Sequence, residues 1–237
     1  MTPLTLSLVV VSATLFTLCD SLSKVQAGRK HGKLTHRFAW IALSILVFTA
    51  CDILSKFWGL TMSIWPLLGI IISTQAAYFL FGRVTRDIGL AIGSSVINAG
   101  NVVSSMIFGI IFLSEWKILS TQQYMGMLCA IIGIYLMMFT GAPADDSEQL
   151  LEAEAPRRRQ RYAMVLLAIL APLTFMVFGL VNAQAGLAIG SGSTNCLNLL
   201  GTMVMGLIAL NEWKKVSRGQ FGGMAAAAAG LVLMLFF

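Results

Sequence analysis

Residues 90–117 read LAIGSSVINAGNVVSSMIFGIIFLSEWK, and residues 187–214 read LAIGSGSTNCLNLLGTMVMGLIALNEWK. The second stretch repeats the first at a constant distance of 97 residues, and 14 of the 28 aligned positions are identical. Each copy is long enough to hold a membrane-spanning helix, which needs roughly 20 predominantly apolar residues. A duplicated spanning segment predicts a chain built from two related halves around a central path.

The composition indicates a membrane protein. Of the 237 residues, 57% are hydrophobic and 11% are charged, whereas a soluble domain carries roughly 25% charged residues. Spanning segments must be helical, because lipid offers no partner for unpaired backbone groups. The sequence therefore predicts an all-α, polytopic transmembrane bundle. Its eight expected spans are approximately 4–24, 38–58, 60–82, 90–113, 122–141, 162–183, 187–210 and 219–237.

The basic residues predict how these spans are oriented. If the eight segments alternate, 14 of the 16 Lys and Arg residues fall in loops on one side, and Lys56 and Lys117 fall on the other. Loops rich in Lys and Arg stay in the cytoplasm. We therefore expect the first side to be cytoplasmic, both termini to face out, and the chain to be a multi-pass protein of the bacterial inner (plasma) membrane.

The repeat predicts the domain organisation. We expect an N-terminal helix pair at 1–59, a first repeat at 60–141, a charged cytoplasmic linker at 142–161 and a second repeat at 162–237. Each copy holds three spans, which is an odd number. The second copy is therefore expected to cross the membrane in the opposite direction to the first, as an inverted-topology repeat.

A second pattern follows each repeated span. The first copy continues with Gln123-Tyr-Met-Gly126 and Gly133, and the second continues with Gln220-Phe-Gly-Gly223 and Gly230. With the preceding Glu-Trp-Lys, this pattern resembles the drug/metabolite transporter superfamily, particularly its EamA-like members, and more distantly the small multidrug resistance transporters. The resemblance covers both repeats. It implies a secondary carrier that moves small metabolites or drugs by alternating access.

Two alternatives to a carrier stay open. EamA-like carriers usually have five plus five spans, whereas this chain has five plus three. A non-transporting membrane assembly or regulatory subunit, derived from a truncated carrier, is therefore the first alternative, and a membrane-embedded enzyme acting on lipid is the second. The sequence holds no GxSxG, P-loop, HExxH or CxxC motif. We accordingly expect no enzyme, no metal, no cofactor and no nucleic-acid partner.

A polar stripe marks each repeated span. The spacing of four, three and four residues places its members on one face of a helix. Amides are unfavourable in hydrocarbon, so both stripes should turn away from lipid. We hypothesise that they line a path for a polar, uncharged or zwitterionic solute; the alternative is hydrogen bonding between helices. The residues are Ser94, Asn98, Asn101 and Ser105 in the first copy, and Ser191, Asn195, Asn198 and Thr202 in the second.

Acidic residues stand near the ends of several spans. Spans 1 and 2 share the echo LFTLCDSLSK at 15–24 and VFTACDILSK at 47–56, in which Asp20 and Asp52 each precede a lysine by four residues. A local ion pair is one interpretation. The other is that Asp20 or Asp52 binds a coupling proton or ion, or a substrate amine.

Two glutamates stand where the repeated spans end. Glu115 and Glu212 each precede a Trp and a Lys, residues typical of the membrane interface. They are interpreted as helix-end caps, or as gating residues at opposite faces of the membrane.

Small residues line spans 5 and 8, and let helices approach closely. We expect them to pack within the chain, with a homodimer face as the alternative. The remaining expected partners are the lipid bilayer and a small-molecule solute.

Overall fold

The computed structural model describes residues 2–27, 37–117, 120–139, 157–209 and 216–236. These residues form eight α-helices and contain no strand, so the prediction of an all-α bundle is confirmed. The helices are α1 (Pro3–Gln26), α2 (Arg37–Thr61), α3 (Ile64–Ile88), α4 (Leu90–Phe112), α5 (Thr121–Phe139), α6 (Arg157–Ala185), α7 (Leu187–Val204) and α8 (Arg218–Phe236). A 3-10 turn, Glu115–Lys117, follows α4, and a π-helical turn, Met205–Ala209, follows α7. Residues 157–161, which the sequence places in the linker, form the start of α6.

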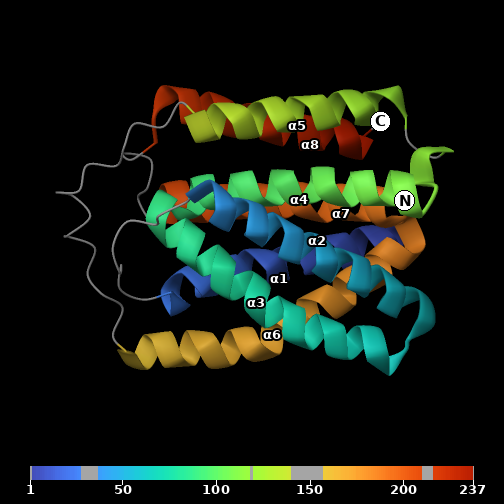
Figure 1. Ribbon diagram of the computed structural model, residues 1–237, viewed down its shortest axis with the longest axis horizontal. Helices are drawn as coiled ribbons and strands as arrows, with labels where there is room; N and C mark the ends of the chain where they lie inside the picture. Colours follow the sequence, from blue (N-terminus) through green and yellow to red (C-terminus); the bar gives the residue numbers. More distant parts are fainter. Residues whose placement is uncertain (1, 28–36, 118–119, 140–156, 210–215, 237) are drawn as a thin grey trace.

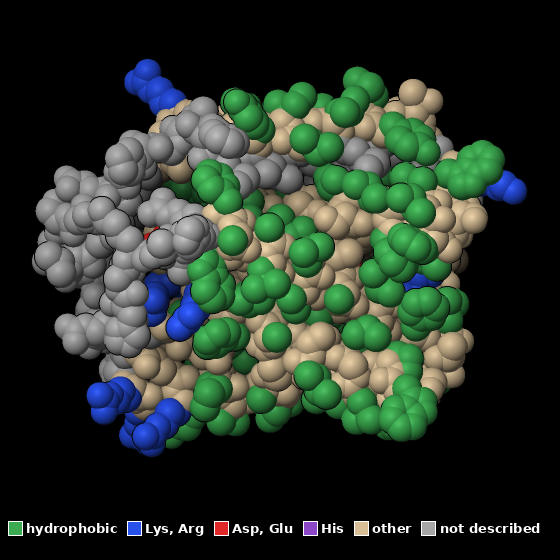
Figure 2. All heavy atoms as spheres, in the orientation of Figure 1, with side chains coloured by type: hydrophobic (Ala, Val, Ile, Leu, Met, Phe, Trp, Pro, Cys, Tyr) green, Lys and Arg blue, Asp and Glu red, His purple; other side chains and the backbone are tan. Residues whose placement is uncertain are grey.

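Five helices are long and apolar enough to cross a membrane, and together with an apolar surface they indicate a membrane-embedded protein. They are Pro3–Gln26, Phe38–Thr61, Ile64–Ile88, Ile92–Phe112 and Arg157–Ala185. Hydrophobic side chains cover the middle of the visible surface, and Lys and Arg side chains lie toward the ends of the long axis (Figure 2). Trp65, Ile72 and Ile208 are each more than 70% exposed, which suits contact with lipid rather than water. The number of eight spans stays a prediction.

The helices form three groups across the bundle (Figure 1). α5 and α8 pack on each other at one side, α4 and α7 lie side by side in the middle, and α1, α2, α3 and α6 cover the other side. Within the last group, α1 packs on α6, and α2 packs on α3 and α6. Toward the middle, α1 packs on α7 and α2 packs on α4. The pair α4 and α7 is therefore enclosed from both sides.

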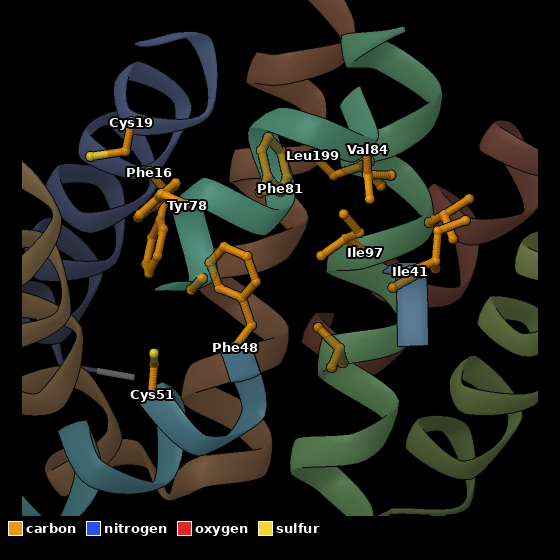
Figure 3. Packing of buried hydrophobic residues seen from close by; sticks show 14 of the residues in the cluster. Phe16, Cys19, Ile41, Phe48, Cys51, Tyr78, Phe81, Val84, Ile97 and Leu199 are labelled. Atoms are coloured by element: carbon orange, nitrogen blue, oxygen red, sulfur yellow. The ribbon is translucent and has the colours of Figure 1, made fainter. Parts of the chain in front are cut away.

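Aromatic rings fill the core beside α4 and α7. Phe16 packs edge-on against Phe175 at 4.9 Å, and Phe48 packs edge-on against Tyr78 at 5.4 Å, both between ring centroids. Figure 3 shows Phe16, Phe48 and Tyr78 gathered between α1, α2 and α3. Such pairs contribute about 0.5–1.5 kcal/mol each beyond the burial of their area. They fix α1 and α2, which carry the two aspartates, against the rest of the bundle.

Glycines start both helices of the central pair. Gly89 (φ 92°) separates α3 from α4, and Gly186 (φ 85°) separates α6 from α7. A residue with a Cβ rarely adopts this backbone conformation. The two glycines are 97 residues apart, so the same turn begins the same segment in each copy.

The small residues of spans 5 and 8 meet inside one chain. A Cβ built on Gly133 of α5 would lie 2.6 Å from the carbonyl oxygen of Gly223 and 2.6 Å from the backbone nitrogen of Ala227, both on α8. The face that suggested a homodimer is thus occupied, at this point, by an intramolecular contact. Dimer formation stays a prediction.

Candidate functional site

The polar stripes of α4 and α7 face each other at the centre of the bundle. All eight side chains are at most 5% exposed. The Oγ of Ser94, near the start of α4, lies 2.7 Å from the Oγ1 of Thr202, near the end of α7. The two helices therefore run in opposite directions along their contact. We call this contact, formed by the eight stripe residues, the seam.

Asp20 reaches the seam from α1. Its Oδ2 accepts a hydrogen bond from the Asn198 amide at 3.0 Å, and one from the Ser94 hydroxyl at 3.4 Å. Asp20 is 1% exposed. One carboxylate oxygen thus takes donors from both helices of the seam.

Asp52 reaches the seam from α2 in the same way. Its Oδ2 accepts hydrogen bonds from the Asn101 amide at 2.9 Å and the Ser105 hydroxyl at 2.8 Å, both on α4. It also accepts one from the Ser191 hydroxyl of α7 at 3.0 Å. Asp52 is 1% exposed as well. Both aspartates and both stripes therefore form a single buried polar site.

The two halves of this site share equivalent serine and asparagine contacts. In the alignment of the two copies, Ser94 corresponds to Ser191, and Asn101 corresponds to Asn198, each 97 residues later. Asp20 bonds Ser94 and Asn198, whereas Asp52 bonds Asn101 and Ser191. Each aspartate therefore accepts hydrogen bonds from one serine and one asparagine, one from each copy. The serine and asparagine at Asp20 are equivalent in position to those at Asp52.

The central amides bond within their own helices. The Asn98 amide donates to the Ser94 hydroxyl at 2.8 Å, and the Asn195 amide donates to the Ser191 hydroxyl at 3.2 Å and to the Ser191 carbonyl oxygen at 2.9 Å. These bonds tie each amide to the serine that holds an aspartate. All eight stripe residues therefore lie in or beside the two carboxylate networks, while their role in transport stays a prediction.

Two threonines extend the site and were not among the predicted site residues. The Thr17 hydroxyl donates to the Asn198 amide oxygen at 3.1 Å, and the Thr49 hydroxyl donates to the Asn101 amide oxygen at 3.0 Å. Each threonine stands three residues before its aspartate, inside the echo shared by 15–24 and 47–56. The echo is the signal that identifies them, because it repeats Thr-x-x-Asp and not the aspartate alone.

A shallow groove borders the Asp20 half of the site. It lies between α1 and α7, has a volume of about 530 Å³, and is lined by Thr17 and by apolar residues such as Val10 and Val204. Thr49, the equivalent of Thr17, is buried at 7% exposure. The α1 side of the network therefore lies nearer to a surface hollow than the α2 side.

The local ion pair considered for Asp52 is not formed. Lys56 instead makes a salt bridge with Glu115, which stands in the 3-10 turn after α4. The structure also contains no salt bridge between Asp20 and Lys24 in the part of the chain that it describes. The interpretation that Asp52 pairs with Lys56 on the same helix is thus wrong, because Lys56 pairs with Glu115 from another segment.

Glu115 closes one end of the seam. Its two carboxylate oxygens accept the backbone N–H groups of Leu187 and Ala188, each at 3.0 Å, at the first turn of α7. Glu115 therefore caps α7, across the seam, rather than the helix that follows it in the chain. Glu212, its counterpart in the second copy, lies outside the described residues.

These contacts set the charge state of Glu115. Burial by itself raises the pKa of this carboxyl, but the hydrogen bonds from Lys56 and from the two α7 N–H groups outweigh it and leave the pKa below its ordinary value of 4.5. A carboxylate at a helix N-terminus is further favoured by the helix dipole. Glu115 is thus an anion that joins α2, the end of α4 and the start of α7.

Replacing Glu115 by glutamine is expected to destabilise the protein near neutral pH. Hydrogen bonds to charged groups contribute roughly 1.5–3 kcal/mol. Since the folded-state pKa is lowered, this contribution is complete above pH 4.5 and is lost as the pH falls through the lowered pKa. Thermal unfolding in detergent should show Glu115→Gln melting below the wild type at pH 7 and converging with it in acid. A melting difference that stays constant into acid would contradict this assignment.

The site is built from charged and hydrogen-bonding groups. Its side chains are carboxylates, amides and hydroxyls, which suit a cation or a hydrogen-bonding solute. Among the described residues, no group of three or more His, Cys, Asp or Glu side chains could hold a metal ion. No family model, no curated protein and no solved structure matches the chain. The site is therefore interpreted from its own geometry.

Proposed function

We propose that this protein is a secondary carrier that moves a small metabolite or drug across the membrane by alternating access. The observation that carries the proposal is the crosswise bonding of Asp20 and Asp52 to both helices of the seam. Ionisable groups inside a membrane are unfavourable, and they mark substrate and ion pathways. Here two such groups converge on one buried polar contact.

An inverted-topology repeat of eight spans is part of this proposal. The antiparallel contact of α4 and α7 supports it, as do the matched bonds of Asp20 and Asp52. The packing of α1 on α6 and α7, and of α2 on α3 and α4, supports adding α1 to the second copy and α2 to the first, so that each half holds four helices. In this arrangement the N-terminal helix pair belongs to the repeat. α1 joins one half and contributes Asp20, and α2 joins the other half and contributes Asp52.

The distribution of positive charge supports the proposed orientation. α1 and α3 end, and α6 and α8 begin, at the same end of the bundle (Figure 1). That end carries Lys24, Arg83, Arg86 and the arginines at the start of α6. By the positive-inside rule this end is cytoplasmic. The membrane is then the plasma membrane of the proposed bacterial source, with both termini outside.

Alternating access gives each part of the site a role. The two halves rock about the seam, which holds the solute near the bilayer midplane. Glu115 and Lys56 lie at the end opposite the basic cluster, where their contact with the first turn of α7 keeps the seam closed. Opening toward the outside therefore requires these bonds to break. Opening toward the cytoplasm leaves them intact.

The stripe amides provide the test of this function. Asn98→Leu and Asn195→Leu are each expected to abolish uptake into proteoliposomes, because they remove the donors that hold Ser94 and Ser191 in place. The solute is first found by screening compounds for a rise in the melting temperature of the purified protein. Ser7→Ala is the matched control, since Ser7 is exposed and its hydroxyl donates to the carbonyl oxygen of Pro3 on the same helix.

Three outcomes would count against a carrier. Unchanged transport in both leucine variants that retain the wild-type melting temperature would reject the seam as the path. Stable co-purification with another protein, without transport of any solute, would favour the assembly-subunit alternative. Turnover of lipid by the purified protein would favour the enzyme alternative.

A further inference from the structure

Both aspartates of the site lack a positive partner in the described part of the chain. The groups that bond them are hydroxyls and amides, all of them neutral. The nearest lysine along α2, Lys56, is engaged by Glu115. An ion removed from water is strongly disfavoured unless an opposite charge joins it. A buried carboxyl group is neutralised either by a proton or by a cation. A ligand that displaces both protons must therefore bring two positive charges, one to each carboxylate.

The spacing of the two carboxylates follows from the helices that hold them. On α4, Asp20 bonds Ser94, and Asp52 bonds Asn101, seven residues further on, together with Ser105 one turn beyond it. On α7, Asp52 bonds Ser191 and Asp20 bonds Asn198, again seven residues apart. At 1.5 Å of rise per residue, both helices separate the carboxylates by about 10 Å along the seam. The seven-residue spacing thus recurs on both helices, as expected for two copies of one repeat.

The surroundings of the two carboxylates are alike. Each accepts from one serine and one asparagine of equivalent position, and each of those asparagines accepts a hydrogen bond from a threonine three residues before the aspartate. Asp52 accepts one further hydrogen bond, from the Ser105 hydroxyl. Neither end of the seam is built to prefer a different chemical group. The ligand that suits such a site carries the same charged group at both of its ends.

We propose that the solute of this carrier is a linear aliphatic diamine, with one ammonium group paired to Asp20 and the other to Asp52; this inference rests on the proposed transport function. A charge-assisted N–H···O bond is about 2.8 Å long. Two such bonds within a separation of about 10 Å leave roughly 5–8 Å between the nitrogen atoms, depending on their angle to the seam. Diamines with three to five carbon atoms span that distance.

The closed seam defines what binding requires. Ser94 and Thr202 are hydrogen-bonded across it, so α4 and α7 separate at this contact to admit a ligand. The Ser94 hydroxyl is then free to turn fully toward Asp20, to which it already donates at 3.4 Å. Diamine binding therefore requires the seam to open at this contact.

A length series on the unmodified protein is the first test. Full-length protein in detergent is titrated with 1,2-diaminoethane, 1,3-diaminopropane, 1,4-diaminobutane, 1,5-diaminopentane, 1,8-diaminooctane and 1-aminobutane, with heat of binding as the readout. The affinity should peak at three to five carbon atoms. 1-Aminobutane, which matches 1,4-diaminobutane without its second charge, should bind tenfold or more weakly. A flat series, or equal affinity for 1-aminobutane, overturns the proposal without requiring any variant to fold.

Single-charge variants are the second test. In Asp20→Asn and Asp52→Asn the preference for 1,4-diaminobutane over 1-aminobutane should disappear, whereas Ser7→Ala should keep it. Uptake of a neutral solute by the wild type, with no binding of diamines, would contradict the diamine proposal and still support the carrier function. Transport of a solute that is coupled to protons, with no diamine bound, likewise overturns the diamine proposal, since the two carboxylates then bind protons. Binding of diamines without transport of any solute supports the ligand and counts against the carrier.

Discussion

Asp52→Asn should stop transport while the protein stays folded. Asparagine keeps the shape of the side chain and an oxygen that accepts from Ser105 and Ser191, but it removes the negative charge that draws a cation into the seam. Removing one partner of a buried charge pair costs roughly 2–5 kcal/mol. The affinity for a cationic solute or coupling ion should therefore fall about 30-fold or more. The initial rate of uptake into proteoliposomes, measured below saturation, reports this loss.

The matched position strengthens the experiment. Asp20→Asn should lose transport to a similar extent, because Asp20 has equivalent partners in the opposite copy. Both variants should melt within a few degrees of the wild type in detergent. Wild-type uptake by either variant at limiting solute concentration would show that the aspartates serve packing alone.

Much of the fold can be predicted from the sequence because the membrane restricts the choices. Apolar runs of about 20 residues must be helices in lipid, and the predicted spans 4–24 and 90–113 differ from α1 and α4 by no more than two residues at each end. α6 differs more, since it begins at Arg157 rather than 162. The first turn of α6 is basic, so hydropathy alone places the start of the span after this turn.

The polar face of each repeated span was likewise visible in the sequence. The spacing of Ser94, Asn98, Asn101 and Ser105 places them on one helical face, and the structure buries all four. Periodicity cannot reveal which helix lies opposite. The contact between Ser94 and Thr202 joins residues 108 positions apart, and it depends on the packing of the whole bundle.

The partners of the charged residues could not be predicted locally. The four-residue spacing of Asp52 and Lys56 favours an ion pair on one helix, yet Lys56 bonds Glu115, 59 residues away. That choice leaves Asp52 to the seam. The sequence does not show which carboxylate a lysine will pair with, because the choice between a local and a distant partner depends on how the helices pack.

Gly179→Ala should be the most destabilising of the conservative substitutions considered for this protein. A Cβ built on Gly179 of α6 would lie 2.4 Å from the carbonyl oxygen of Ser55 and 3.3 Å from the ring of Trp58, both on α2. Real Cβ atoms do not approach backbone oxygen so closely, so α2 and α6 must move apart. Overpacking of this kind costs typically about 1–3 kcal/mol. Thermal melting in detergent should place Gly179→Ala several degrees below the wild type.

Gly222→Ala is the matched control for this substitution. A Cβ on Gly222 of α8 would meet no atom within 4 Å, so alanine should be neutral or stabilise the helix by up to about 1 kcal/mol. Ser55 stands three residues after Asp52 on α2 and hydrogen-bonds the Asp52 carbonyl oxygen. Displacing α2 at Ser55 therefore also draws Asp52 away from Asn101 and Ser191, and Gly179→Ala should lose transport together with stability. Equal melting temperatures for the two alanine variants would mean that α2 and α6 do not touch at this glycine.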